Sequence, residues 1–261
     1  TEVADFVLEA SVCSELTPAL AAAVTGRPDA AALLETCVRL GLFLDRFEGP
    51  HGVVYRWHAS FARRCAEILD IDAERAAGCH RRAAAALQAT DPTASITHSL
   101  HASEFLTARE TLLHHWLGLV VGARADEVEC TAMLMLRRTP DDAQVLLVRA
   151  CASDVLGDHR VARELFRRAE AMIGRSGDDD EPAVLQIARL FIADERAEVA
   201  EASAKVQQML LDADSTDLGD RAALNYLLGW TEIRHRGNPM VPLEYFSAAA
   251  REAQSLGDRE L

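Results

Sequence analysis

The feature that most constrains the fold is the recurrence of helix-length segments over most of the chain. From Asp72 onward the sequence carries no strand pattern, and amphipathic helical segments follow one another with short breaks between them. The breaks lie at Asp91-Pro92, Thr139-Pro140, Gly157-Asp158, the acidic loop 174–182 and Gly237–Pro239. Repeated helix pairs of this kind predict a helical solenoid.

Composition supports this expectation. Hydrophobic residues make up 49% of the chain, charged residues 26% and aromatic residues only 5%, while alanine is abundant. Alanine is the strongest helix former, and small side chains allow helices to approach closely. We therefore expect stacked helices rather than a β-sandwich.

The first 70 residues follow a different pattern. We expect a helical stripe through Val12-Cys13, helices from Thr17-Pro18 to Gly26 and from Pro28 to Gly41, strands at 42–44 and 53–57 around the turn 48–52, and a helix from about His58 to Leu69. A hydroxyl N-cap before proline, and a glycine at the end, are typical helix boundaries. Three helices with a two-stranded hairpin predict a winged-helix arrangement.

One later segment is similar to the tetratricopeptide (TPR) template. In residues 143–174, small residues, a turn glycine and an aromatic residue fall at the template positions Ala143, Ala150, Gly157, Ala162, Phe166 and Ala169. A second segment, 223–256, fits with its first helix displaced by one residue. The predicted fold is mainly α: a degraded winged-helix domain with a short β-hairpin (1–70), then a TPR-like α-superhelix of antiparallel helix pairs (71–261).

Several blocks carry a family resemblance. They are Phe6–Val12, Leu16–Leu20, Ala23–Leu34, Gly41–Leu44, Tyr55–Phe61, His80–Ala84 and Ile96–Ala102. In this order they resemble the region that follows the nucleotide-binding domain in MalT-like LuxR-family regulators, which belong to the STAND class of signalling ATPases. The resemblance covers about residues 1–120, and the remainder is similar only as TPR-like helices.

The resemblance implies a P-loop ATPase upstream, a superhelical sensor and a C-terminal DNA-binding helix-turn-helix. It also implies that the winged helix packs on the ATPase, with His58 contacting the phosphates of bound ADP. The second histidine usual in the family is Ala59 here. Two roles for His58 therefore stay open: a nucleotide-phosphate sensor in the full-length protein, and a helix-start histidine packed on the hairpin.

Charge and residue usage narrow the functions of the chain itself. The net charge is −14, which disfavours direct nucleic-acid contact. The sole lysine, Lys205, follows no glycine-rich loop, so the chain lacks a P-loop and we expect no ATP hydrolysis and no enzyme activity from it alone. No cofactor is expected in the chain, whereas ATP or ADP is expected in the full-length protein.

The location and the extent of the protein are also expectations. Six cysteines without a C-x-x-C pair indicate buried free thiols in a reducing cytosol. The chain has no signal peptide and no apolar run long enough for a membrane span, so we expect a cytoplasmic protein. It opens within a helix pattern and stops at Leu261 without a helix terminator, and we expect it to be a piece of a longer protein.

Other polar clusters have alternative interpretations. His98 and His101, with His114 and His115 one helix later, have a spacing that zinc could use, but ordinary surface or interface packing explains them as well. Asp178–Glu181 lacks the pattern of an EF-hand and is interpreted as a solvated loop. Arg63, Arg64, Arg81 and Arg82 alternate with acidic residues, which indicates ion pairs on solvated helix faces.

Three functions remain open. The first is a sensor that binds a small effector or a protein, associates with itself and acts on the upstream ATPase domain of the same protein. The second is a TPR-type interaction scaffold of a related signalling ATPase, for example one fused to a cyclase. The third is an enzyme that uses the region of His98 and His101. The ligand-binding residues, the effector and the oligomeric state are not predicted.

Overall fold

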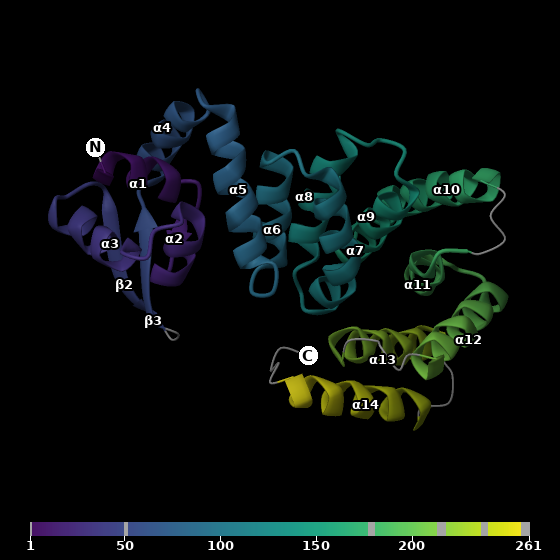
Figure 1. Cartoon of the computed structure of the whole chain (residues 1–261). Coiled ribbons are helices and arrows are strands. Elements are labelled where there is room, and N and C mark those ends of the chain that lie inside the picture. The colour runs from purple at the N-terminus through teal and green to yellow at the C-terminus, as the bar shows by residue number, and fades with distance from the viewer. Residues whose placement is uncertain (1, 50–51, 177–180, 213–217, 236–239, 257–261) are drawn as a thin grey trace. The chain divides into compact units, whose positions relative to one another are not determined.

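A computed structural model describes the chain except for residues 1, 50–51, 177–180, 213–217, 236–239 and 257–261. Within the described residues the chain forms fourteen helices and three strands (Figure 1). It divides into two compact units, Thr1–Thr111 and Leu112–Leu261.

The first unit combines a small sheet with helices. Its elements are α1 (Glu2–Ala10), β1 (Glu15–Leu16), α2 (Pro18–Thr25), α3 (Ala30–Arg39), β2 (Leu44–Gly49), β3 (Gly52–Trp57), α4 (Ala59–Leu69), α5 (Ala73–Leu87), α6 (Pro92–His101) and the start of α7 (Phe105–Val121). The sheet is antiparallel in the order β1-β3-β2. Helices α1 to α3 with this hairpin form the winged-helix arrangement that we predicted.

Local sequence explains the boundaries of α2. The Thr17 hydroxyl accepts a hydrogen bond from the Leu20 N–H at 3.1 Å, and Pro18 occupies the first helical position. Gly26 ends the helix with φ +69°, a left-handed conformation that favours glycine. The apolar face of α2 then packs Ala21 and Val24 into the core with Phe6 and Leu34.

Two details of the sheet differ from prediction. Strand β1 was not predicted; Glu15 pairs with Arg56 of β3, and the Arg56 Nε donates to the Glu15 carboxylate at 2.9 Å. Phe43 is not a strand residue, because its φ is +55° and β2 starts at Leu44. The left-handed backbone at Phe43 turns the chain out of α3 and into the hairpin.

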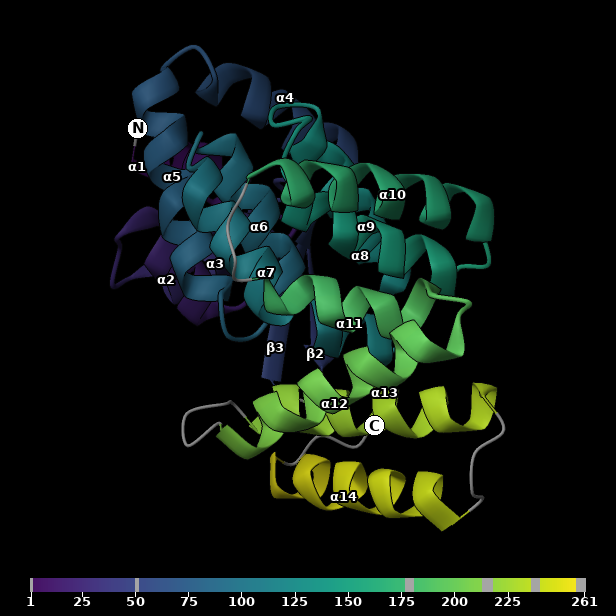
Figure 2. The same ribbon diagram turned by 90° about the vertical axis from the view of Figure 1, so that its right-hand side faces the viewer.

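The second unit is helical throughout its described residues, as predicted. It contains the rest of α7, then α8 (Ala125–Leu136), α9 (Ala143–Val155), α10 (His159–Ser176), α11 (Ala183–Ile192), α12 (Arg196–Asp212), α13 (Leu218–Arg234) and α14 (Met240–Leu256). Consecutive helices pack as pairs, most extensively α9 with α10 and α13 with α14. Figure 2 shows α13 and α14 side by side.

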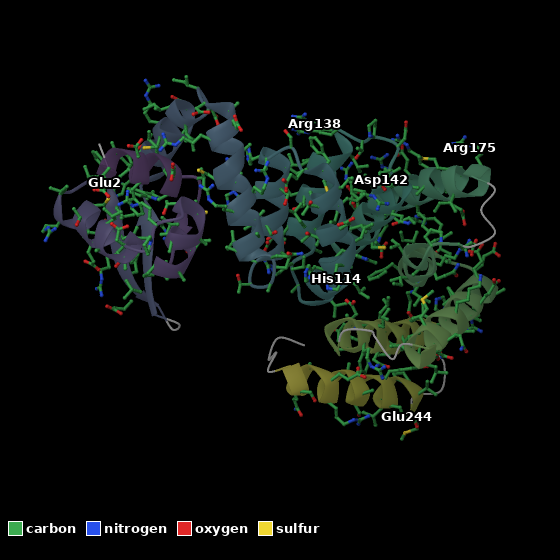
Figure 3. The ribbon with its side chains drawn as sticks, in the orientation of Figure 1. Glu2, His114, Arg138, Asp142, Arg175 and Glu244 are labelled. Atoms are coloured by element: carbon green, nitrogen blue, oxygen red, sulfur yellow. The ribbon has the colours of Figure 1, made fainter. Side chains whose placement is uncertain are left out.

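Three of the four predicted alanine positions are buried in the α9–α10 pair, and Ala143 is partly exposed. Ala150, Ala162 and Ala169 are fully buried, and Gly157 turns the chain between the two helices with φ +87°. Asp142 (labelled in Figure 3) caps α9 by accepting hydrogen bonds from the Gln144 and Val145 N–H groups. The 143–174 segment is therefore a tightly crossed helix hairpin.

The second predicted pair, α13 and α14, also packs closely. A Cβ atom at Gly229 would lie 2.7 Å from the ring of Phe246, so the two helices meet where only glycine fits. The turn at Gly237 lies outside the described residues. The predicted domain boundary near residue 70 stays a prediction; the first compact unit includes α5 and α6 as well as the winged-helix elements.

Candidate functional site

His58 lies where β3 ends and α4 begins. It is the N-cap residue of α4, but its side chain makes no capping hydrogen bond. The backbone N–H of His58 donates to the Phe43 carbonyl oxygen at 2.9 Å, which fixes the histidine against the base of the hairpin. The imidazole is about half exposed, and its Nε2 lies 3.1 Å from Oδ2 of Asp45 on β2.

Aromatic rings surround the imidazole. The Phe43 ring lies edge-on to His58 with centroids 5.9 Å apart, and it packs on Phe61 of α4 at 5.4 Å. Phe61 in turn packs on Trp57 at 5.6 Å. Phe43 is 57% exposed, so its ring lies on the surface next to the imidazole and is not part of the core. Sequence reasoning does not identify this position of Phe43, because it predicts residue 43 within a strand.

This arrangement provides a single anion contact. The N-terminus of a helix carries partial positive charge and N–H groups without intrahelical partners, and an exposed imidazole beside it adds a donor. The chain holds no glycine-rich phosphate loop. The residues around His58 thus fit one contact to a phosphate held by other groups, and they do not fit a complete nucleotide site. Any such anion would compete with Asp45 for the imidazole.

His98 and His101 of α6 do come together, but with a partner that sequence reasoning missed. His80 of α5 stacks on His101 with ring centroids 4.8 Å apart, and its Nδ1 lies 2.8 Å from Nδ1 of His98. His98 is buried, which corrects the surface interpretation, and its Nε2 lies 3.6 Å from the Cys13 sulfur. Within the described part of the chain, no group of three metal-ligating side chains could hold a metal ion.

Burial controls the protonation of this cluster. It lowers the pKa of both His80 and His98 to about 4, and the neighbouring imidazoles act in the same direction. Burial also raises the pKa of the Cys13 thiol to about 12. His80, His98 and Cys13 are therefore neutral at pH 7.

The remaining candidates have ordinary structural roles. His114 and His115 contact each other edge-on in α7, and His114 is exposed (Figure 3). Arg64 pairs with Glu67, Arg81 pairs with Glu104, and Arg82 donates to the Val24 carbonyl. The contacts of Arg64 and Arg81 agree with the predicted ion pairing, whereas Arg82 binds a backbone carbonyl oxygen instead of a carboxylate.

Two further predictions concern the acidic loop and the six cysteines. Residues 178–180 of the acidic loop lie outside the described residues, while Glu181 accepts hydrogen bonds from Arg189 and Lys205. All six cysteines are free, as expected, but Cys130 is exposed, which corrects the expectation that every thiol is buried.

The second unit contains a cavity of about 600 Å³. Its walls come from the ends of α7 and α9 and from α11 and α13, segments far apart in the sequence. The lining residues are mostly apolar: Val120, Val121, Ala123, Asp154, Val155, Leu190, Phe191, Tyr226, Leu227, Trp230, Thr231, Ile233 and Arg234. A concave, mostly apolar site of this size is typical of small-molecule binding.

No helix within the described residues has both the length and the apolar character required to cross a bilayer. No solved structure matches the chain.

Comparison with known proteins connects the first unit to a defined domain. Residues 1–77 match the family model of the MalT winged helix domain. The chain is 29% identical over 175 residues to the HTH-type transcriptional regulator MalT of Serratia proteamaculans, covering 65% of this chain and 19% of that protein. It is 32% identical over 120 residues to MalT of Klebsiella pneumoniae, covering 44% of this chain and 13% of that protein.

The chain therefore spans at most about a fifth of the length of these curated relatives. The match to the winged-helix model agrees with the sheet, the hairpin and the helices of residues 1–69. The N-terminal part of this chain is a winged-helix domain similar to that of the MalT transcriptional regulators.

Proposed function

We propose that this chain is the winged-helix and effector-binding part of a MalT-like, LuxR-family transcription regulator of the STAND ATPase class, acting in the cytoplasm. The observation that carries the proposal is the match of residues 1–77 to the MalT winged helix domain. The exposed imidazole of His58, held at the start of α4, supports it independently. In this proposal the ATPase domain and the DNA-binding domain belong to the longer protein, and the chain itself performs no catalysis and contacts no DNA.

His58 would report the nucleotide state through a change of partner. Its Nε2 faces the Asp45 carboxylate at 3.1 Å in this structure. A phosphate of a nucleotide bound to the upstream ATPase domain could replace Asp45 as the hydrogen-bond partner of this imidazole, because the N-terminus of α4 favours negative charge at the same place. Exchange of Asp45 for phosphate would then favour the closed state of the regulator.

The helical pairs of the second unit would be the TPR-like sensor. The buried alanines of the α9–α10 crossing and the Gly229–Phe246 contact support a superhelix of stacked pairs, which presents a surface for an effector, a protein or another protomer. Binding there would shift the equilibrium between the closed, ADP-held state and the open, ATP-bound state.

An interaction scaffold is the second candidate, and one observation favours it. Met240 and Leu243 of α14 are 59% and 57% exposed, as expected of a helix that contacts another protein. A scaffold would bind its partner equally well with ADP or ATP present, whereas a sensor would bind its effector differently in the two states.

The test is ADP retention by the full-length protein that contains this chain. Purified protein should carry ADP, and His58→Ala should release it faster. Absence of bound nucleotide in the full-length protein would contradict the proposal.

A further inference from the structure

The cavity of the second unit has a mouth made of apolar side chains. Val155, Trp230 and Ile233 line it and are 49%, 50% and 47% exposed. Isolated exposed apolar residues are common on proteins. Three that border one cavity form an apolar patch, and a bound ligand would remove this patch from water. The volume of about 600 Å³ lies within the range of roughly 300–1,000 Å³ that is typical of small-molecule sites.

The charged residues of the lining are already engaged. Asp154 Oδ1 contacts His159 Nδ1 at 2.8 Å. Arg234 donates to the carbonyl oxygens of Phe191 and Ala193 at the C-terminal end of α11, the second at 2.9 Å. The carboxylate and the guanidinium also offset each other in net charge. The cavity therefore has no unbalanced charge that would select an ionic ligand.

The same arginine contacts make the walls rigid. The last carbonyl groups of a helix have no intrahelical partners, and Arg234 of α13 satisfies those at the end of α11. Trp116 of α7 packs on Phe191 of α11 with ring centroids 6.3 Å apart. Three of the helices that enclose the cavity are thus tied together without a ligand, which lowers the entropic cost of binding.

Two hydrogen-bond donors remain available on one face of α13. Tyr226 and Trp230 are one helical turn apart, with ring centroids 6.4 Å apart at 66°. Within the described residues the contacts of these two side chains are ring contacts with each other and with Phe246, and neither the Tyr226 hydroxyl nor the Trp230 indole N–H has a hydrogen-bond partner there. Aromatic faces with unpaired donors suit a flat ligand that carries acceptor atoms.

We propose that this cavity binds an uncharged, planar aromatic small molecule with hydrogen-bond acceptors, through Tyr226 and Trp230. The inference rests on the proposed function in one respect: it assigns the effector of the sensor to this cavity. Binding itself needs neither nucleotide nor the rest of the regulator, so the two proposals can fail separately.

The test uses the 261-residue chain and Nile red, a neutral planar dye with acceptor atoms whose fluorescence rises in apolar surroundings. Saturable binding with one dye per chain is expected. Val155→Trp should fill the mouth and weaken binding at least ten-fold, while Leu156→Trp is the matched control, because Leu156 is adjacent, 52% exposed and not part of the lining. Tyr226→Phe should weaken binding about two- to ten-fold by removing one hydrogen bond.

Three outcomes would overturn the proposal. The first is absence of saturable binding by a chain whose circular dichroism shows it folded. The second is equal weakening by Val155→Trp and Leu156→Trp, which would place the dye elsewhere. The third is dissociation of an oligomer by Val155→Trp in sedimentation velocity with unchanged dye binding, which would make the cavity mouth an interface between copies of the chain. ADP retention by the full-length protein is a separate measurement, so none of these three outcomes decides the proposed function.

Discussion

The Nδ1 atoms of His80 and His98 lie 2.8 Å apart, so a single proton must lie between the two rings. One ring donates and the other accepts, and either assignment leaves Nε2 of His98 able to contact the Cys13 sulfur. If both rings became imidazolium, two N–H groups and two positive charges would face each other. The contact joins α5 to α6 and therefore cannot persist once both histidines are protonated.

The first prediction is that acid destabilises this unit through the histidine pair. Burial lowers the pKa of each ring from 6.5 to about 4, although Asp70 and Asp91 act in the opposite direction. The unfolded chain therefore binds more protons between these values, and the stabilisation is present above about pH 6.5 and is lost as pH falls towards 4. We expect a loss on the order of 2 kcal/mol per histidine between pH 7.5 and 5.

Urea unfolding at the two pH values measures this loss. His80→Gln should reduce the difference between pH 7.5 and 5, whereas His159→Gln, which changes an exposed histidine, should leave it as in the wild type. Identical pH dependence in wild type and His80→Gln would show that the pair is not the cause.

The second prediction concerns the close contact between Gly229 of α13 and Phe246 of α14. Gly229→Ala would place a methyl group 2.7–3.0 Å from three atoms of the Phe246 ring, so the ring or the helix must shift. We expect destabilisation by about 1–3 kcal/mol, the usual cost of overpacking.

Gly118→Ala is the matched control. It also changes a helical glycine, but nothing lies within 4 Å of its added Cβ atom. Alanine there should be neutral or stabilising by up to about 1 kcal/mol because of its helix propensity. The melting temperature should fall in Gly229→Ala and stay unchanged or rise in Gly118→Ala, and equal shifts would contradict the close α13–α14 contact.

The third prediction is that a single thiol reacts rapidly in the native chain. Cys130 is exposed, while the other five cysteines are buried, and burial raises the pKa of Cys13, Cys37, Cys65, Cys79 and Cys151. Only thiolates react quickly with disulfide reagents. Titration with Ellman's reagent should release one fast equivalent, which Cys130→Ser abolishes. Two or more fast equivalents would mean that the first or second unit opens readily.

Much of the fold could be predicted because its signals are local. The residue pattern of strand Val53–Trp57 and the helix-boundary residues Thr17-Pro18 and Gly26 can each be recognised within a few residues of sequence. Strand β1 could not be predicted, because two residues carry no periodicity and pair only because β3 is beside them. The turn at Phe43 was missed because a left-handed phenylalanine has no sequence signature.

The sites depend on tertiary contacts, which limits prediction further. His58 could be named as a candidate because its family block and its place at a helix start are both local features, and its role stays a prediction. The contact of His80 with His98 joins helices α5 and α6, and nothing in the sequence indicates which face of α5 meets α6. The cavity was missed for the same reason, since Val120, Leu190 and Trp230 come together only when α7, α11 and α13 fold.

The exchange of partners at His58 can be tested from the Asp45 side. Asp45→Asn removes the competing carboxylate but keeps a side chain of the same size near Nε2. In the full-length protein we expect this variant to retain ADP more tightly than the wild type, because no carboxylate at position 45 competes with the phosphate for the His58 imidazole. Weaker retention would mean that Asp45 orients the imidazole rather than competing for it.

The most direct measurement is the ADP dissociation rate of the full-length protein with His58→Ala. The matched control is His159→Ala, which removes an exposed imidazole that contacts a carboxylate at 2.8 Å in the second unit. Loss of one hydrogen bond to a charged group is worth about 1.5–3 kcal/mol, so ADP should leave roughly ten- to a hundred-fold faster from His58→Ala and at the wild-type rate from His159→Ala. Equal rates in wild type and His58→Ala would contradict the assignment of His58 as the phosphate contact of the winged-helix domain.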